Sequence, residues 1–121
     1  MKNDFNTKYC ERTKKFAIQL CKTLNIDQNT EASRIVIRQI LRSGTSVSAN
    51  FRAAARARSK AEYYAKICIV VEECDETVFW FEILSEAALI PKVNIIQLYQ
   101  ESIELLKIFA VTKRKLKYGK D

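Results

Sequence analysis

The chain contains no histidine, two glycines and one proline in 121 residues. Without histidine it lacks the side chain most often used as a general base. So few glycines and prolines leave few breaks, and 48% of the residues are hydrophobic. This composition favours long helices over a sheet, which needs more turn residues. No uninterrupted apolar run approaches the ~18 residues of a transmembrane helix, so a membrane-spanning segment is not expected.

Cysteine occurs four times, but in no spacing typical of a metal site. Cys10, Cys21, Cys68 and Cys74 are separated by ten, 46 and five residues, and none forms a C-x-x-C pair. The N-terminal residues lead into a polar helix rather than an apolar signal region, which predicts a cytoplasmic protein. Thiols stay reduced there. We therefore expect buried free thiols, no metal and no cofactor.

No catalytic constellation can be assembled from the sequence. It has no G-x-x-x-x-G-K or G-x-G-x-x-G phosphate loop and no G-x-S-x-G nucleophile elbow. The carboxylates of Glu72, Glu73 and Glu76 lack the Glu-x-x-His pairs of a di-iron bundle site, so we expect a solvated or ion-paired face. The sequence predicts that the protein is not an enzyme.

Apolar residues recur at helical spacing in four stretches. These cover residues 5–24, about 30–57, about 59–88 and from 93 into a basic tail. Asn29 or Thr30 can cap the second stretch, and Ser59 and Glu62 have the spacing of a capping box for the third. Gly44 lies in the apolar arc of the second stretch, where it is expected to permit close helix packing. Short loops then predict an all-α, antiparallel up-down four-helix bundle as one domain over residues 1–121.

The positive charge of the chain is concentrated in one stretch. The protein has 21 basic and 14 acidic residues. Between residues 32 and 61 there is no Asp or Glu, and removing the seven basic residues found there leaves 14 basic and 14 acidic residues. These seven are Arg34, Arg38, Arg42, Arg52, Arg56, Arg58 and Lys60. A basic block that local acids do not offset indicates a polyanionic partner.

Five of these arginines share one face of the second helix. On a helical wheel Arg34, Arg38, Arg42, Arg52 and Arg56 lie within about 80° of one another and form an arginine ridge about 33 Å long. Arginine suits bidentate contact with phosphate, so the ridge predicts binding to the backbone of RNA or DNA. The alternative is that acids of the third helix or of another subunit pair with the ridge. In that case the bundle is a protein-interaction scaffold, and an acidic protein partner is possible in either case.

The third helix carries more apolar surface than one core requires. Ile69, Phe79, Trp80 and Ile83 lie opposite its core-facing arc. Exposed together, they would form a patch typical of an interface, which predicts self-association. The alternative is that the first helix wraps over this face.

Three segments carry a family resemblance. They are GTSVSANFRAA at residues 44–54, ARSKAEY at 57–63 and E-x-x-E-T-x-x-W-F at 73–81. They resemble a family of bacterial four-helix bundle proteins associated with intervening sequences in large-subunit ribosomal RNA genes. The spacing is most similar to the branch related to the accessory protein of diversity-generating retroelements. Many members have Ser-x-x-x-Asn-Ile-Ala-Glu-Gly in the middle, of which Ser46 and Asn50 match here, while the last four positions read Phe-Arg-Ala-Ala.

The resemblance implies an up-down bundle that assembles as a ring-like homopentamer with a basic surface. In the retroelement branch the pentamer binds nucleic acid and a reverse transcriptase, so a partner of that kind is implied as possible here. Asn50 lies between the ridge and the apolar arc of its helix. It is expected to be a buried hydrogen-bonding residue that fixes helix or subunit register, or else a direct nucleic-acid contact. Ser46, which also matches the family pattern, is likewise expected to be a structural polar residue.

Overall fold

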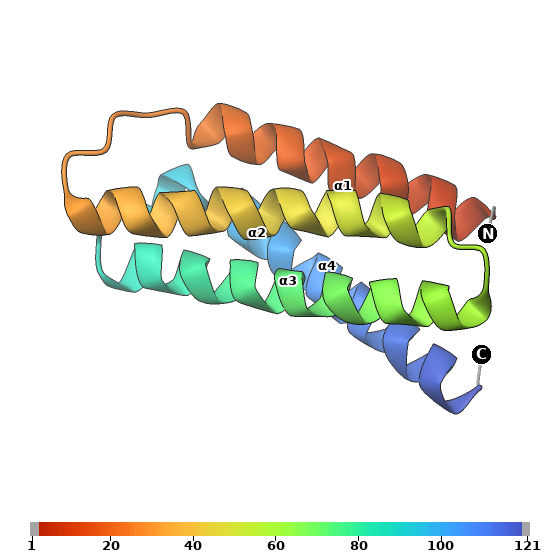
Figure 1. Cartoon of the computed structure of the whole chain (residues 1–121). Coiled ribbons are helices and arrows are strands. Elements are labelled where there is room, and N and C mark those ends of the chain that lie inside the picture. The colour runs from red at the N-terminus through yellow and green to blue at the C-terminus, as the bar shows by residue number, and fades with distance from the viewer. Residues whose placement is uncertain (1–2, 120–121) are drawn as a thin grey trace.

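Four antiparallel helices make up the computed structural model, which describes residues 3–119 (Figure 1). They are α1 (Asp4–Thr23), α2 (Glu31–Ala55), α3 (Lys60–Glu86) and α4 (Ile96–Tyr118), with a 3₁₀ turn, η1 (Lys92–Asn94), before α4. The chain runs up and down in sequence order, and both ends of the described chain lie at the same end of the bundle (Figure 1). The predicted all-α up-down four-helix bundle is confirmed.

Side-chain hydrogen bonds cap the N-termini of α2 and α3. The side chain of Thr30 accepts a hydrogen bond from the Ser33 N–H at 3.0 Å, and that of Ser59 accepts one from the Glu62 N–H at 3.1 Å. Each satisfies a backbone donor that the first helical turn leaves without a partner. Of the two residues considered for capping α2, Thr30 does so. Helix α3 ends at Glu86, two residues before the expected boundary, and Ala88 has a left-handed φ of 55°.

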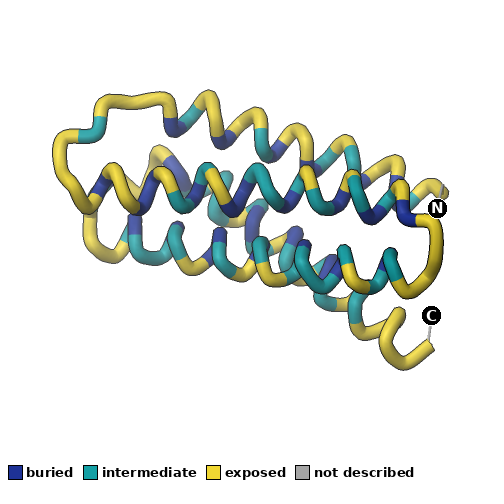
Figure 2. Tube along the Cα trace, viewed as in Figure 1, coloured by how far each residue is buried: buried dark blue, intermediate teal, exposed yellow. Residues whose placement is uncertain are grey.

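The core lies along the axis between the helices. Figure 2 shows buried positions recurring along each helix and an exposed end to α4. Phe51 of α2 and Phe109 of α4 are fully buried, with ring centroids 5.0 Å apart. Of the four free cysteines only Cys74 is buried, while Cys10 and Cys68 are half-buried and Cys21 is exposed. The expectation of buried thiols is therefore right for Cys74 and wrong for Cys21, since the latter faces outward on α1.

Gly44 sets the distance between α1 and α2. A Cβ atom built on Gly44 would lie 2.2 Å from Cδ1 of Leu20, whose side chain is fully buried. The glycine thus lets the two helices approach closely, as expected, and α2 continues through it without a break.

Candidate nucleic-acid interface

Helix α2 places the whole arginine ridge on the surface. Arg34, Arg38, Arg42, Arg52 and Arg56 are all exposed. The buried residues of α2 occupy its opposite side, among them Ile40, Val47 and Phe51. Arg56 is the C-cap residue, because α2 ends at Ala55. The ridge predicted from the helical wheel is therefore present as one exposed face.

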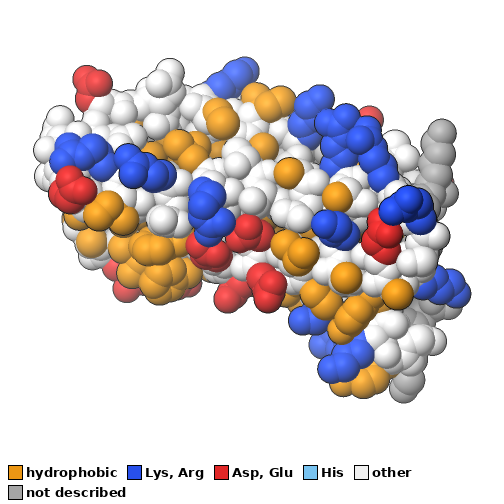
Figure 3. Space-filling view, viewed as in Figure 1, with side chains coloured by type: hydrophobic (Ala, Val, Ile, Leu, Met, Phe, Trp, Pro, Cys, Tyr) orange, Lys and Arg blue, Asp and Glu red, His pale blue; other side chains and the backbone are white. Residues whose placement is uncertain are grey.

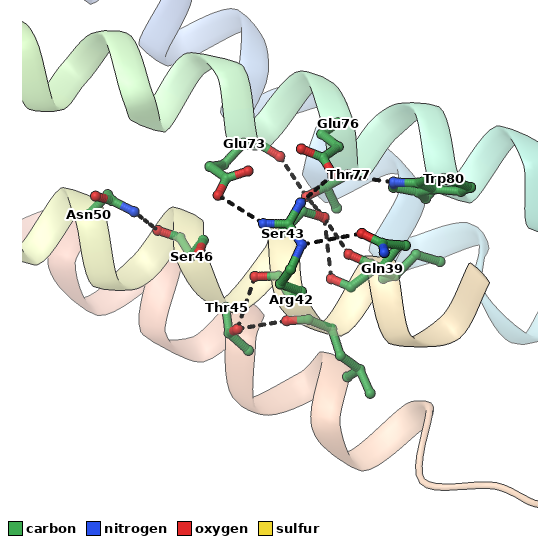
Figure 4. A network of polar contacts seen from close by, with 12 residues as sticks. Gln39, Arg42, Ser43, Thr45, Ser46, Asn50, Glu73, Glu76, Thr77 and Trp80 are labelled. Atoms are coloured by element: carbon green, nitrogen blue, oxygen red, sulfur yellow. Dashed lines mark hydrogen bonds and ion pairs between the residues drawn. The ribbon is translucent and has the colours of Figure 1, made fainter. Parts of the chain in front are cut away.

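Arg42 is paired with the acids of α3. Its Nη1 lies 3.5 Å from a carboxylate oxygen of Glu73, and its Nη2 donates a hydrogen bond to Glu76. The indole Nε1 of Trp80 donates to the same Glu76 carboxylate at 3.4 Å, and Figure 4 shows these side chains converging between the two helices. The hydrogen bond from Arg42 lowers the pKa of Glu76 and raises that of Arg42 itself. At this position the salt-bridged alternative is correct.

Two further arginines meet acids at the edges of the acid-free stretch. Arg34 pairs with Glu31 at 2.7 Å, and Nε of Arg58 lies 4.0 Å from Glu62. Both pairs join neighbouring turns of one segment and are exposed, so each contributes little to stability. They nevertheless offset the charge at both ends of the basic stretch.

The remaining basic residues of the stretch have no such partner. Among residues 3–119 no ion pair involves Arg38, Arg52, Arg56 or Lys60. Figure 3 shows Lys and Arg side chains distributed over α1 and α2, while Asp and Glu side chains gather over α3 beside a hydrophobic cluster. The uncompensated charge therefore lies on α2 and its C-cap, at Arg38, Arg52 and Arg56, and on the first residue of α3, Lys60.

Ser46 and Asn50 are joined by a hydrogen bond within their own helix. The Asn50 amide donates to the Ser46 carbonyl at 3.0 Å inside α2 (Figure 4), and Asn50 is half-buried. Asn50 is hydrogen-bonded as expected, but it is half-buried rather than buried, and this bond lies within one helix. A role in subunit register stays a prediction.

Other residues make the buried polar contacts between helices. The hydroxyls of Ser43 on α2 and Thr77 on α3 are 2.8 Å apart, and the Tyr63 hydroxyl donates to Oδ1 of Asn6 at 2.8 Å. All four residues are buried. The sequence analysis did not identify these pairs. The available signal was that Ser43 and Thr77 fall on the same helical faces as the apolar core residues.

The predicted interface residues on α3 differ in their solvent exposure. Phe79 is 48% exposed, whereas Ile69, Trp80 and Ile83 are half-buried. The Phe79 and Trp80 rings meet edge to face with centroids 4.9 Å apart. Helix α1 packs mainly against α2, so the alternative that it wraps over this face is wrong.

The described residues carry neither a metal cluster nor a membrane span. Within residues 3–119 no group of three or more Cys, Asp or Glu side chains could hold a metal ion. No helix in the same part is both long and apolar enough to cross a bilayer.

Comparison with known proteins gives a family and similar solved structures. The sequence model of the 23S rRNA-intervening sequence proteins matches residues 6–110. A crystal structure of a protein of unknown function from the S23 ribosomal protein family of Bacteroides thetaiotaomicron superimposes with a TM-score of 0.80 at 28% identity. The alignment covers 90% of this chain and 97% of the other. No curated protein matches the sequence.

Proposed function

Because the chain belongs to the 23S rRNA-intervening sequence protein family, we propose that it is a non-enzymatic, homo-oligomeric bundle that binds the backbone of RNA or DNA through the arginine ridge. The observation that carries this proposal is the set of exposed guanidiniums at Arg38, Arg52 and Arg56, which form no ion pair among the described residues. Arg58 and Lys60 lie just beyond them in the chain. These cations are available to replace the counterions of a polyphosphate.

The arrangement favours contact with the backbone over readout of bases. The ridge is a straight face of a helix inside a bundle, not a helix projecting into a groove or an aromatic sheet that stacks bases. Phosphate contacts fix position without reading sequence. Binding is therefore expected to be weakly sequence-specific and to fall steeply with salt.

Self-association would multiply these contacts. We propose that Phe79, with the half-buried Ile69, Trp80 and Ile83, forms the interface of a ring-like homopentamer. An exposed aromatic residue beside partly buried apolar neighbours supports an interface. Each subunit of a closed ring would present its ridge in the same orientation, which raises avidity for a long strand.

We propose that the protein acts in the cytoplasm as an accessory to a nucleic-acid-processing protein, which could resemble a reverse transcriptase or present an acidic surface. The acidic residues on α3 leave a second, oppositely charged face for a protein partner.

The test is a fluorescence-anisotropy titration of a labelled RNA hairpin and a matched DNA duplex at two salt concentrations, with oligomer mass set by light scattering. Arg38→Gln/Arg52→Gln should weaken binding and leave the oligomer and melting temperature unchanged. Lys92→Gln/Lys107→Gln removes two charges outside α2 and serves as the control. Absence of binding by an assembled wild-type protein at low salt would sink the proposal.

A scaffold that binds only proteins is the second candidate. It is favoured by the pairing of Arg42 with Glu73 and Glu76, which joins one residue of the ridge to α3. If arginines serve assembly throughout, Arg38→Gln/Arg52→Gln will break the oligomer or lower its melting temperature. The two functions thus make opposite predictions for the same variant.

A further inference from the structure

A groove of about 600 Å³ runs between α1 and α2 beside the C-terminal half of the arginine ridge. Helix α1 contributes Cys10 and Lys14, and α2 contributes Ala49, Arg52 and Arg56. The two arginines are one helical turn apart and therefore lie on the same side of α2. The groove thus joins the two ridge cations nearest the end of α2 to a lysine of another helix.

Small side chains create the space. Ala17 of α1 and Ala49 of α2 line the groove, while the long basic side chains lie around them. Their methyl groups leave space between the two helices that larger side chains would fill. The result is a depression bordered by cations rather than a row of side chains on a flat surface.

The charge in the groove is strongly unbalanced. Three cations, Lys14, Arg52 and Arg56, face one acid, Glu11, and none of these four takes part in an ion pair within residues 3–119. Burial raises the pKa of the Cys10 thiol, and the positive charges of Arg52 and Arg56 oppose that shift. The charges of both guanidiniums are therefore felt at the Cys10 thiol, which lines the same groove.

We infer that the α1–α2 groove seats a phosphodiester of a nucleic-acid strand, with Arg52 and Arg56 donating to its oxygens and Lys14 reaching it from α1. This assignment rests on the proposed function and deepens it, because it selects one part of the ridge as the binding site. The volume exceeds that of a single phosphate, and the groove is continuous with an exposed helix face, so a polymer fits better than a free anion. In the N-terminal half of the ridge, Arg34 and Arg42 are already paired with acids, and only Arg38 has no ion pair among the described residues.

The decisive variant fills the groove and leaves every charge in place. Ala49→Leu replaces a methyl with an isobutyl group on an exposed helical position that lines the groove. Ala32→Leu makes the same change at an exposed position of α2 outside the groove. We expect Ala49→Leu to raise the Kd for the labelled RNA hairpin about tenfold, as for the loss of a charge-assisted hydrogen bond, and Ala32→Leu to leave it unchanged.

Cys10 supplies an independent readout in the unmodified protein. Bound RNA should slow alkylation of Cys10 by iodoacetamide, followed by peptide mass spectrometry, while Cys21 on the same helix lies outside the groove and keeps its rate. Inorganic phosphate at matched ionic strength is the comparison. If it protects Cys10 as well as RNA does at equal phosphate concentration, the site holds a free anion and the polymer assignment is wrong.

The outcomes separate the groove from the general function. If wild type binds RNA but Ala49→Leu binds equally well and Cys10 is not protected, the groove assignment fails and ridge binding stands. If wild type binds neither RNA nor DNA, the proposed function fails and the groove with it. Reduced binding of Ala49→Leu together with protection of Cys10 supports both.

Discussion

Arg12 of α1 forms a two-pronged ion pair with Glu101 of α4. Its Nε and Nη2 atoms donate to the two carboxylate oxygens of Glu101, each at 2.8 Å. Helices α1 and α4 contact each other far less than α1 and α2, α2 and α3, or α3 and α4 do, and α4 diverges toward its C-terminal end (Figure 1). The ion pair therefore holds α1 and α4 together where they make few apolar contacts with each other.

Replacing Glu101 by Gln should destabilise the bundle by about 1 kcal/mol, because a parallel two-bond pair is stronger than an ordinary surface ion pair. Urea unfolding of wild type, Glu101→Gln, Arg12→Gln and the double variant gives the coupling energy directly. A coupling of zero would show that α1 and α4 are held by their apolar contacts alone.

Gly44→Leu should cost about 1–3 kcal/mol, since a side chain there must displace the buried Leu20 and push α1 from α2. Ala49→Leu, at an exposed position on the same helix, should stay within about 0.5 kcal/mol of wild type. Thermal unfolding followed by circular dichroism measures both. Equal stability of Gly44→Leu and wild type would contradict the close-packing role of the glycine.

The sequence predicted the fold well because its signals are local. Helical periodicity and the caps at Thr30 and Ser59 define the helices, and short loops leave the up-down bundle as the simplest packing. The ridge followed from the period of one helix. Its members are exposed as predicted.

The division of the ridge could not be predicted, since it depends on what the neighbouring helices place beside it. Arg42 and Arg38 are one turn apart, yet only Arg42 reaches the α3 acids. Likewise, Lys14 of α1 and Arg52 of α2 are far apart in sequence and line one groove only through the packing of the two helices. A single sequence does not indicate which side chains of two different helices will lie next to each other.

The Arg42–Glu76 pair makes a pH-dependent contribution to stability. The pKa of Glu76 is lowered in the folded state, chiefly by the hydrogen bond from Arg42. Its contribution is therefore complete above the unfolded-state pKa of about 4.3 and is lost as the pH falls through the lower folded-state value.

Glu76→Gln should accordingly be less stable than wild type above about pH 5, and the difference should shrink toward about pH 3. Urea unfolding of both proteins across that range provides the measurement. Glu72→Gln, an exposed acid of α3 outside any ion pair among the described residues, is the control. A difference that is constant with pH would contradict a role for the charged form of Glu76.

Phe79→Glu should convert the proposed oligomer to monomers. Phe79 is 48% exposed, and its ring meets that of Trp80 edge to face. A carboxylate at this position would therefore place a charge in the centre of the proposed apolar interface. Val93→Glu introduces the same residue at a position that is 78% exposed and belongs to η1 rather than α3, and it should leave the mass unchanged.

Light scattering measures the mass of each variant, and the RNA titration shows what assembly contributes. Each Phe79→Glu monomer keeps its arginine ridge, so it should still bind RNA at low salt, with an affinity reduced by the loss of avidity. A monomeric variant with wild-type affinity would mean that one ridge suffices. A variant that remains oligomeric would place the subunit interface on a different face of the bundle.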